Sequence, residues 1–308
     1  MQCSRKGLAT LTQAQLDAWT IEAKTQTQGG QLPNYIPLLA QTNSSWFAVQ
    51  IRGLEGQVFS AGDVRLSFPL MSVVKPFLLL FLLEHLGAQA VFSRVGLEPS
   101  DQPFNSLSQL QADGGRPRNP MINSGAIALA SLLPGQDAHS RCKNLCHWLN
   151  ERSHCHLVLD EAMLKSVRSL PNERNRAITQ LLAESGYLDS TEIALDTYNH
   201  ICCLSGTITD LALLGMLLAH NTSMTLPENR RTINALMMTC GLYQASSRFA
   251  VEVGVPTKSG VSGAIVSVVP AQGAIACYSP ALDETGNSKA GLFLLRQLAH
   301  RLDLSVFG

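Results

Sequence analysis

Apolar positions recur with helical spacing through most of the chain. Residues 11–23 have the pattern of an amphipathic helix, for which Thr12 is a suitable N-cap. From residue 69 to about residue 247 nearly every segment is again helical in pattern, and residues 292–302 form a closing helix whose last turn is basic. The sequence therefore predicts a long helical stretch between two shorter helices near the termini.

Strand patterns occur only near the two ends of the chain. Residues 45–52 and 56–60 have the composition of two strands joined by a tight turn. Strand character returns at residues 254–267 and 273–278. We therefore expect both ends of the chain to contribute to one sheet.

These elements predict one domain of residues 1–308 with a helical insertion. The expected sheet lobe comprises about residues 1–66 and 250–308, and the expected helical lobe about residues 67–249. The predicted class is α/β, in the sense of α+β: an antiparallel sheet with flanking helices plus a helical lobe.

The most apolar run, residues 68–83, is interrupted by Lys75 and Pro76. It falls short of the roughly 20 residues that a membrane span needs, so it predicts a buried core helix. Pro76 removes a backbone donor and disfavours helical geometry at Lys75, so we expect a kink there.

Candidate chemistry lies at the start of this run. Ser72 and Lys75 are three residues apart and share one face of a helix. A serine hydroxyl must lose its proton as it attacks, and a lysine can accept that proton when burial or a neighbouring cation lowers its pKa. The alternative is a helix start with one snorkelling lysine.

Two later motifs support catalysis. Asn119-Pro-Met-Ile-Asn123-Ser-Gly offers carboxamides before an apolar helix, and Lys258-Ser-Gly-Val261-Ser-Gly follows a predicted strand. Ser-x-x-Lys, a polar Asn loop and Lys-Ser-Gly, in this order, are typical of serine acyl-transfer enzymes of the β-lactamase type.

Charge and cysteine content narrow the function classes. The chain has 23 basic and 23 acidic residues, which gives no electrostatic footprint for nucleic acid or an anionic membrane. The first thirty residues have a short basic start without an apolar run, so we expect a cytoplasmic protein. The eight cysteines are then expected to be reduced thiols.

One cluster of cysteines and histidines could form a structural metal site, or its members could be ordinary buried cysteines and surface histidines. Its members are Cys142, Cys146, His147, His154, Cys155 and His156. Their spacing matches no zinc pattern, so no metal is predicted.

Taken together, the motifs resemble those of the serine-dependent glutaminases, a β-lactamase-like family of bacteria and mitochondria. The resemblance covers about residues 35–278. It rests on the following segments: Tyr35-Ile-Pro, Ser72-x-x-Lys75, Asn119 to Gly125, Arg174-Asn175-Arg-Ala, Leu195-Asp-Thr-Tyr198, Cys240-Gly-Leu-Tyr243 and Lys258 to Gly263.

The resemblance implies cofactor-free hydrolysis of L-glutamine to L-glutamate and ammonia. It implies that Ser72 attacks the amide carbon, that Lys75 takes the proton, and that Tyr243 relays it to the departing ammonia. The backbone amides of Ser72 and Val261 would hold the oxyanion. It also implies a homodimer or homotetramer.

The resemblance further implies that Tyr35, Asn123, Asn175 and Tyr198 surround the substrate. For each tyrosine alone, a buried hydroxyl that caps the core is the competing interpretation. Lys258 is either a second cation that tunes Lys75 or a structural ion-pair partner.

One departure concerns substrate choice. The family has a glutamate seven residues before Asn175, where it pairs with the substrate amino group, but this chain has Arg168. Either Glu173 takes over that role, or the preferred substrate is not free L-glutamine. The alternatives to a glutaminase are therefore a catalytically altered homologue with another amide substrate or a binding role, and a β-lactamase or penicillin-binding-type acyl-transferase.

Overall fold

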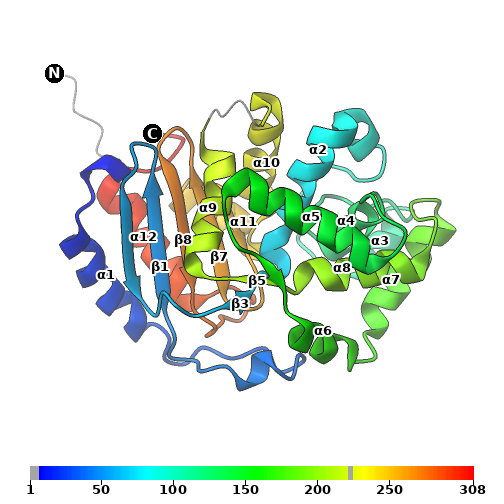
Figure 1. The fold of residues 1–308 in the computed structure, drawn as a ribbon, viewed down its shortest axis with the longest axis horizontal. Coiled ribbons are helices and arrows are strands. Elements are labelled where there is room, and N and C mark those ends of the chain that lie inside the picture. The colour runs from blue at the N-terminus through cyan, green and yellow to red at the C-terminus, as the bar shows by residue number, and fades with distance from the viewer. Residues whose placement is uncertain (1–6, 221–224) are drawn as a thin grey trace.

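The computed structural model describes residues 7–220 and 225–308. Its centre is a five-stranded antiparallel sheet in the order β2-β1-β8-β7-β6 (Figure 1). Ala48 of β1 pairs with Gly62 of β2 on one side and with Tyr278 of β8 on the other. The strands are β1 (Ala48–Gly53), β2 (Val58–Gly62), β6 (Thr257–Ser259), β7 (Ala264–Val269) and β8 (Gly273–Tyr278). The predicted assembly of the sheet from both ends of the chain is thus confirmed.

The two faces of the sheet pack against different helices. Val49 and Ile51 of β1 belong to a core shared with the terminal helices α1 (Gln13–Thr25) and α12 (Lys289–Leu302), whereas Ala48 belongs to the core of the helical lobe. This division follows from the two-residue period of a strand. Thr12 caps α1 in a capping box with Gln15, as predicted for this N-cap.

The helical lobe covers the other face, where α9 lies directly on the sheet (Figure 1). Its helices are α2 (Lys75–Phe92), α3 (Leu107–Ala112), α4 (Asn123–Ala130), α5 (Ala138–Ser153), α6 (Glu161–Arg168), α7 (Glu173–Glu184), α8 (Thr191–Cys202), α9 (Ile208–Ala219) and α10 (Pro227–Cys240). The short helix α11 (Ser246–Glu252) instead packs Phe249 into the core shared with the terminal helices. The described ranges also contain four short 3-10 helices: η1 (Leu8–Thr10), η2 (Leu39–Gln41), η3 (Met71–Val74) and η4 (Tyr243–Ala245). The predicted lobe limits at residues 66–67 and 249–250 stay a prediction.

A second, three-stranded sheet lies inside the stretch predicted as helical. Its strands are β3 (Phe68–Pro69), β5 (Leu204–Gly206) and β4 (Val158–Leu159), in that order. Each has only two or three residues, which is too short to produce a two-residue period in the sequence. This sheet matters because β3 leads directly into η3 and α2.

The predicted kink at Pro76 is wrong. The α-helix begins at Lys75, so Pro76 lies in its first turn, where an N–H has no intrahelical partner in any case. The carbonyl of Ser72 instead accepts the N–H of Lys75, within the preceding 3-10 helix. The break in α2 occurs at Gly87, whose φ of 78° is not helical.

The apolar helical stretch is longer than the sequence pattern indicated. Met71–Phe92 spans 22 residues with a mean hydropathy of 1.5, so its length and composition alone would fit a membrane span. Its most apolar window is 72% buried inside the protein, and Phe77 to Leu83 lie in the core. The interpretation of this segment as a buried core helix therefore agrees with the structure.

Candidate active site

Ser72 lies in η3, at the junction between the small sheet and α2. The residue before it, Met71, has a left-handed backbone with φ of 48°, a conformation that non-glycine residues adopt at a cost in free energy. This turn directs the chain from β3 into α2 and leaves Ser72 only 6% exposed. The predicted nucleophile is thus held on a rigid, buried turn.

Lys75 lies one turn of 3-10 helix after Ser72 and is fully buried. Residues i and i+3 of a 3-10 helix lie on the same face, so the two side chains point the same way, as predicted. Lys75 Nζ donates hydrogen bonds to Met121 O at 3.1 Å and to Asn123 Oδ1 at 2.8 Å. Burial lowers the pKa of Lys75 to about 8. About one tenth of this amine is therefore neutral at pH 7 and can accept a proton, and that fraction grows as the pH rises.

Asn123 connects three of the predicted site residues. Its Oδ1 accepts hydrogen bonds from Lys75 Nζ and from the hydroxyl of Tyr198 at 2.9 Å. Its Nδ2 donates to Asn175 Oδ1 at 3.1 Å. The N-terminus of α4 thereby joins α2, α7 and α8 around one carboxamide.

Tyr243, the first residue of η4, lies beside the nucleophile. It has a left-handed backbone with φ of 56°, and its phenol lies close enough to the Ser72 side chain for the two groups to interact. Its hydroxyl also donates to Ser259 O at 3.4 Å. Burial raises the pKa of Tyr243 well above its usual value, so the phenol carries its proton at neutral pH.

Val261 belongs to the turn between β6 and β7, next to Gly260. A Cβ on Gly260 would lie 3.3 Å from Ser72 N and 2.8 Å from Leu70 O, so only a glycine allows this close approach. No described residue accepts a hydrogen bond from the backbone N–H of Ser72 or of Val261. Two unpaired backbone donors beside a buried serine are suited to an oxyanion.

Lys258 is the second fully buried lysine of the site. Its Nζ donates to Gly241 O at 3.0 Å and to Ser259 O, and it lies 4.6 Å from the centroid of the Tyr243 ring. Burial and the charge of Lys75 lower its pKa. Its contacts in the described part of the chain are therefore with carbonyl oxygens and a phenol, which does not fit the predicted alternative of an ion-pair partner.

Arg168 does not act as an isolated cation. It ends α6 and forms a bidentate ion pair with Asp196 of α8, with its terminal nitrogen 2.6 Å from Asp196 Oδ2 and 2.7 Å from Oδ1. The Arg168 side chain is 46% exposed. Glu173, the predicted substitute for the family glutamate, is exposed at the start of α7 and makes no hydrogen bond or ion pair with a described residue.

Tyr35 differs from the other predicted site residues in being 48% exposed. Its phenol lies close enough to Tyr198 and Tyr243 to contribute to the electrostatic environment of both. Tyr35 thus lies on the outer side of the site, whereas the other two tyrosines are buried.

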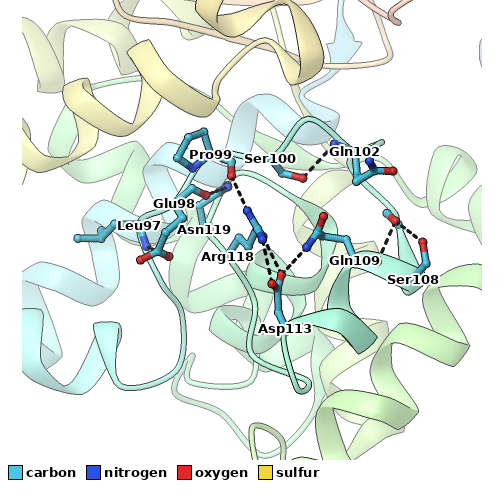
Figure 2. A network of polar contacts seen from close by, with 11 residues as sticks. Leu97, Glu98, Pro99, Ser100, Gln102, Ser108, Gln109, Asp113, Arg118 and Asn119 are labelled. Atoms are coloured by element: carbon cyan, nitrogen blue, oxygen red, sulfur yellow. Dashed lines mark hydrogen bonds and ion pairs between the residues drawn. The ribbon is translucent and has the colours of Figure 1, made fainter.

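The loop before α4 holds the Asn motif in place (Figure 2). Arg118 donates to both carboxylate oxygens of Asp113 and to the carbonyl of Pro99, and Asn119 Nδ2 donates to Glu98 O at 2.7 Å. Asn119 Oδ1 in turn accepts the N–H of Met121, whose carbonyl holds Lys75. The hydrogen bonds of this loop therefore help to fix the position of Lys75, the predicted base.

Three groups that contact the predicted site belong to none of the sequence motifs. Phe104 packs its ring 4.8 Å from that of Tyr243, and its carbonyl accepts the N–H of Asn123. Asn287 Oδ1 accepts a hydrogen bond from Ser259 Oγ, and Asn287 Nδ2 donates to Leu242 O. The third group is the carbonyl of Met121. A carbonyl has no sequence signal, and Phe104 and Asn287 lie in loops without a motif.

The cysteine and histidine cluster forms no metal site in the described ranges. No group of three or more His, Cys, Asp or Glu side chains there could hold a metal ion. Cys142, Cys146 and Cys155 are free thiols, and burial raises the pKa of each.

Comparison with known proteins identifies the family. The family model for glutaminase matches residues 30–307. The chain belongs to the glutaminase family. The glutaminase of Synechocystis is 46% identical over 291 residues, which cover 94% of this chain and 89% of the relative. The glutaminase of Pseudoalteromonas atlantica is 39% identical and covers 93% of this chain and 96% of its own length.

Solved glutaminase structures share the fold. The probable glutaminase ybaS superposes with a TM-score of 0.89 at 36% identity, covering 96% of this chain and 99% of its own. The Bacillus subtilis glutaminase YbgJ, solved as a covalent complex with 5-oxo-L-norleucine, gives a TM-score of 0.86 at 32% identity, with coverage of 96% and 99%. The predicted family, fold class and enzyme class are therefore confirmed, and the chain is a glutaminase.

Proposed function

We propose that this glutaminase hydrolyses the side-chain amide of L-glutamine through an acyl-enzyme on Ser72. The observation that carries the proposal is that Ser72 contacts a protonated phenol, Tyr243, and shares a helix face with a buried amine, Lys75. A covalent complex of the Bacillus subtilis glutaminase with 5-oxo-L-norleucine, formed by reaction with 6-diazo-5-oxo-L-norleucine, supports a nucleophilic step in this family.

In the proposed acylation step, Ser72 Oγ forms a bond to the amide carbon and its proton passes to neutral Lys75. The negative charge on the amide oxygen is held by the backbone N–H groups of Ser72 and Val261. Removal of one such donor costs about 3 kcal/mol in other enzymes. The tetrahedral intermediate then loses ammonia, which receives its proton through the phenol of Tyr243.

In the proposed deacylation step, water attacks the acyl carbon and the Ser72 ester bond breaks. The proton path of the first step is reversed: the attacking water gives up a proton through Tyr243, and Lys75 returns a proton to Ser72 Oγ as L-glutamate leaves. No cofactor takes part in this scheme.

The proposed substrate contacts come from Tyr35, Asn123, Asn175 and Tyr198. Arg168 is compatible with an amino acid substrate because its charge is neutralised by Asp196 at the surface of α6 and α8. We propose free L-glutamine as the substrate on this ground.

Ammonia release by the purified protein tests the proposal. The substrates are L-glutamine, D-glutamine, L-asparagine and the β-lactam nitrocefin, with Ser72→Ala as the control. Release from L-glutamine that is lost in Ser72→Ala would support the scheme. Equal release by Ser72→Ala would overturn the nucleophile assignment, and no release from L-glutamine would overturn the substrate assignment.

We also propose that the protein acts in the cytoplasm as a homodimer or homotetramer. The free thiols of the described cysteines are suited to a reducing compartment, and resemblance to family members suggests self-association. Light scattering coupled to size-exclusion chromatography measures the assembly directly, and a monomer at micromolar concentration would contradict it.

A further inference from the structure

A hollow of about 800 Å³ opens next to the turn that carries Tyr243. None of the eight predicted site residues lines it. Its walls come from α11, the start of α12, the loop that follows β8, and the segment before Tyr35. Gln244 and Ala245, which directly follow Tyr243 in η4, line it as well.

Two arginines form one wall of the hollow. Arg248 of α11 and Arg296 of α12 each donate their Nε to Glu252, at 2.6 Å and 3.0 Å. The terminal nitrogens of the two guanidinium groups make no hydrogen bond with a described residue. Two guanidinium groups thus share one carboxylate, which leaves a net positive charge and free donors on this wall.

Two acidic residues line the hollow as well. Asp283 and Glu284 lie in the loop after β8 and line the same hollow. Asp283 Oδ1 is saturated, because it accepts the N–H and hydroxyl of Thr285 and the N–H of Asn287. Glu284 is exposed and makes no ion pair or hydrogen bond with any residue in the described ranges.

We propose that this hollow is a second binding site for a free α-amino acid. The ligand carboxylate binds the terminal nitrogens of Arg248 and Arg296, and its ammonium group binds Glu284. Guanidinium groups recognise carboxylates through paired charge-assisted hydrogen bonds. The carboxylates that line the same hollow disfavour a ligand that carries only negative charge, and a zwitterion can pair with both the guanidinium groups and the carboxylates.

A short chain of hydrogen bonds links this hollow to Tyr243. Asp283 holds Asn287, and Asn287 binds both Leu242 O, one residue before Tyr243, and Ser259 Oγ. The hydroxyl of Tyr243 donates to the carbonyl of the same Ser259. A ligand that fixes the loop after β8 therefore changes the position of the Tyr243 phenol. Because this phenol takes part in the proposed proton transfer, binding of the ligand should change kcat more than KM.

Calorimetric titration with L-glutamate tests the site after the active site has been blocked. The protein is first treated with 6-diazo-5-oxo-L-norleucine, and the mass gain on Ser72 reports separately on the proposed nucleophile. We expect one equivalent of L-glutamate to bind the blocked protein. Absence of binding up to 50-fold excess over the active-site dissociation constant (roughly, a ΔG difference above 2 kcal/mol) would overturn the proposal.

Variants test whether the two arginines bind the ligand. Arg296→Gln and Arg248→Gln should each weaken L-glutamate binding by about tenfold or more, as expected for the loss of a charge-assisted hydrogen bond. Arg301→Gln is the matched control, because Arg301 lies on the same helix against Trp19 and does not line the hollow. Equal affinity in all three variants would overturn the assignment.

Glutarate separates the two charges of the ligand. It has the carboxylates of L-glutamate without the ammonium group, so it should bind the blocked wild-type protein more weakly than L-glutamate. Glu284→Gln should remove this difference, whereas a preference that persists would overturn the role of Glu284.

In steady-state assays, added L-glutamate should lower the kcat of the wild type, and Arg296→Gln should lose this effect. A purely competitive pattern in the wild type would overturn the link to Tyr243.

Discussion

Lys75 Nζ donates a 2.8 Å hydrogen bond to Asn123 Oδ1, the same oxygen that accepts the hydroxyl of Tyr198. Asn123 is a neutral acceptor, so it fixes the position of the amine without supplying a counter-charge. Burial can then lower the pKa of Lys75 to about 8. The amide side chain at this position therefore determines both where the base lies and how readily it gives up its proton.

The first prediction concerns the pH dependence of turnover. Because Lys75 must be neutral to accept the proton of Ser72, kcat/KM should rise with pH and level off above a midpoint of about 8. Asn123→Asp places a carboxylate beside the amine and favours its charged form, so the midpoint should move up by about 1 unit or more. A pH–rate profile of both proteins measures the shift. An unchanged or lower midpoint in Asn123→Asp would contradict Lys75 as the base.

The second prediction concerns Arg168. Its ion pair with Asp196 is partly exposed on both sides, and pairs of this kind contribute about 0.5 kcal/mol to the free energy of unfolding. Arg168→Ala should therefore lower stability by that amount and leave the KM for L-glutamine within about twofold, because the guanidinium is bound to Asp196. Denaturant unfolding measures the change in stability, and steady-state kinetics measure KM. Asp196→Ala is the control, because it removes the same ion pair from the other side. A tenfold fall in KM in Arg168→Ala would mean that Arg168 opposes substrate binding.

The third prediction concerns the close approach of the two lobes at Gly260. A methyl group there would lie 2.8 Å from Leu70 O, so Gly260→Ala must push the turn that carries Val261 away from Ser72. Loss of one aligned oxyanion donor should reduce kcat by about 100-fold. Gly186→Ala is a useful comparison, because its φ of 78° makes alanine costly by about 1 kcal/mol although nothing lies within 4 Å. Gly186→Ala should lose stability and keep its kcat; a normal kcat in Gly260→Ala would argue against the donor role of Val261.

The fourth prediction concerns Pro76. In the first turn of α2 it breaks no hydrogen bond, so Pro76→Ala should lower the free energy of unfolding by about 1–2 kcal/mol, through the loss of two buried ring carbons and the greater freedom of the unfolded chain. Relief of an internal kink would instead stabilise the protein by about 3 kcal/mol. Urea unfolding distinguishes the two results, and a large gain in stability would show that the helix is strained at this position.

Much of the fold could be predicted from the sequence because its strongest patterns are local. The cap at Thr12, the hairpin of β1 and β2, and the apolar run before Leu83 each depend on neighbours within a few residues. The small sheet was missed because strands of two or three residues are stabilised by long-range pairing, such as Phe68 with Gly206. The kink at Pro76 was misjudged because the start of a helix depends on the preceding turn, which here is a 3-10 helix.

The sequence could predict those site residues whose side chains belong to motifs. Ser72, Lys75, Asn123 and Tyr243 do meet in one place. The pairing of Arg168 with Asp196 could not be foreseen, because it joins two helices that no periodicity relates. Nor could the roles of Met121 O and Asn287, since a backbone carbonyl and a loop amide act through their position in space alone.

The pairing of β1 with β8 has a consequence for synthesis on the ribosome. Ala48 leaves the exit tunnel long before Tyr278, its partner in the sheet, has been made. During that interval the hairpin of β1 and β2 lacks its inner neighbour, while the helices from α2 to α10 can already pack against one another. The turn that carries Tyr243 and the strand that carries Lys258 also arrive late, so a nascent chain stalled before β8 holds Ser72 and Lys75 but not a finished catalytic centre.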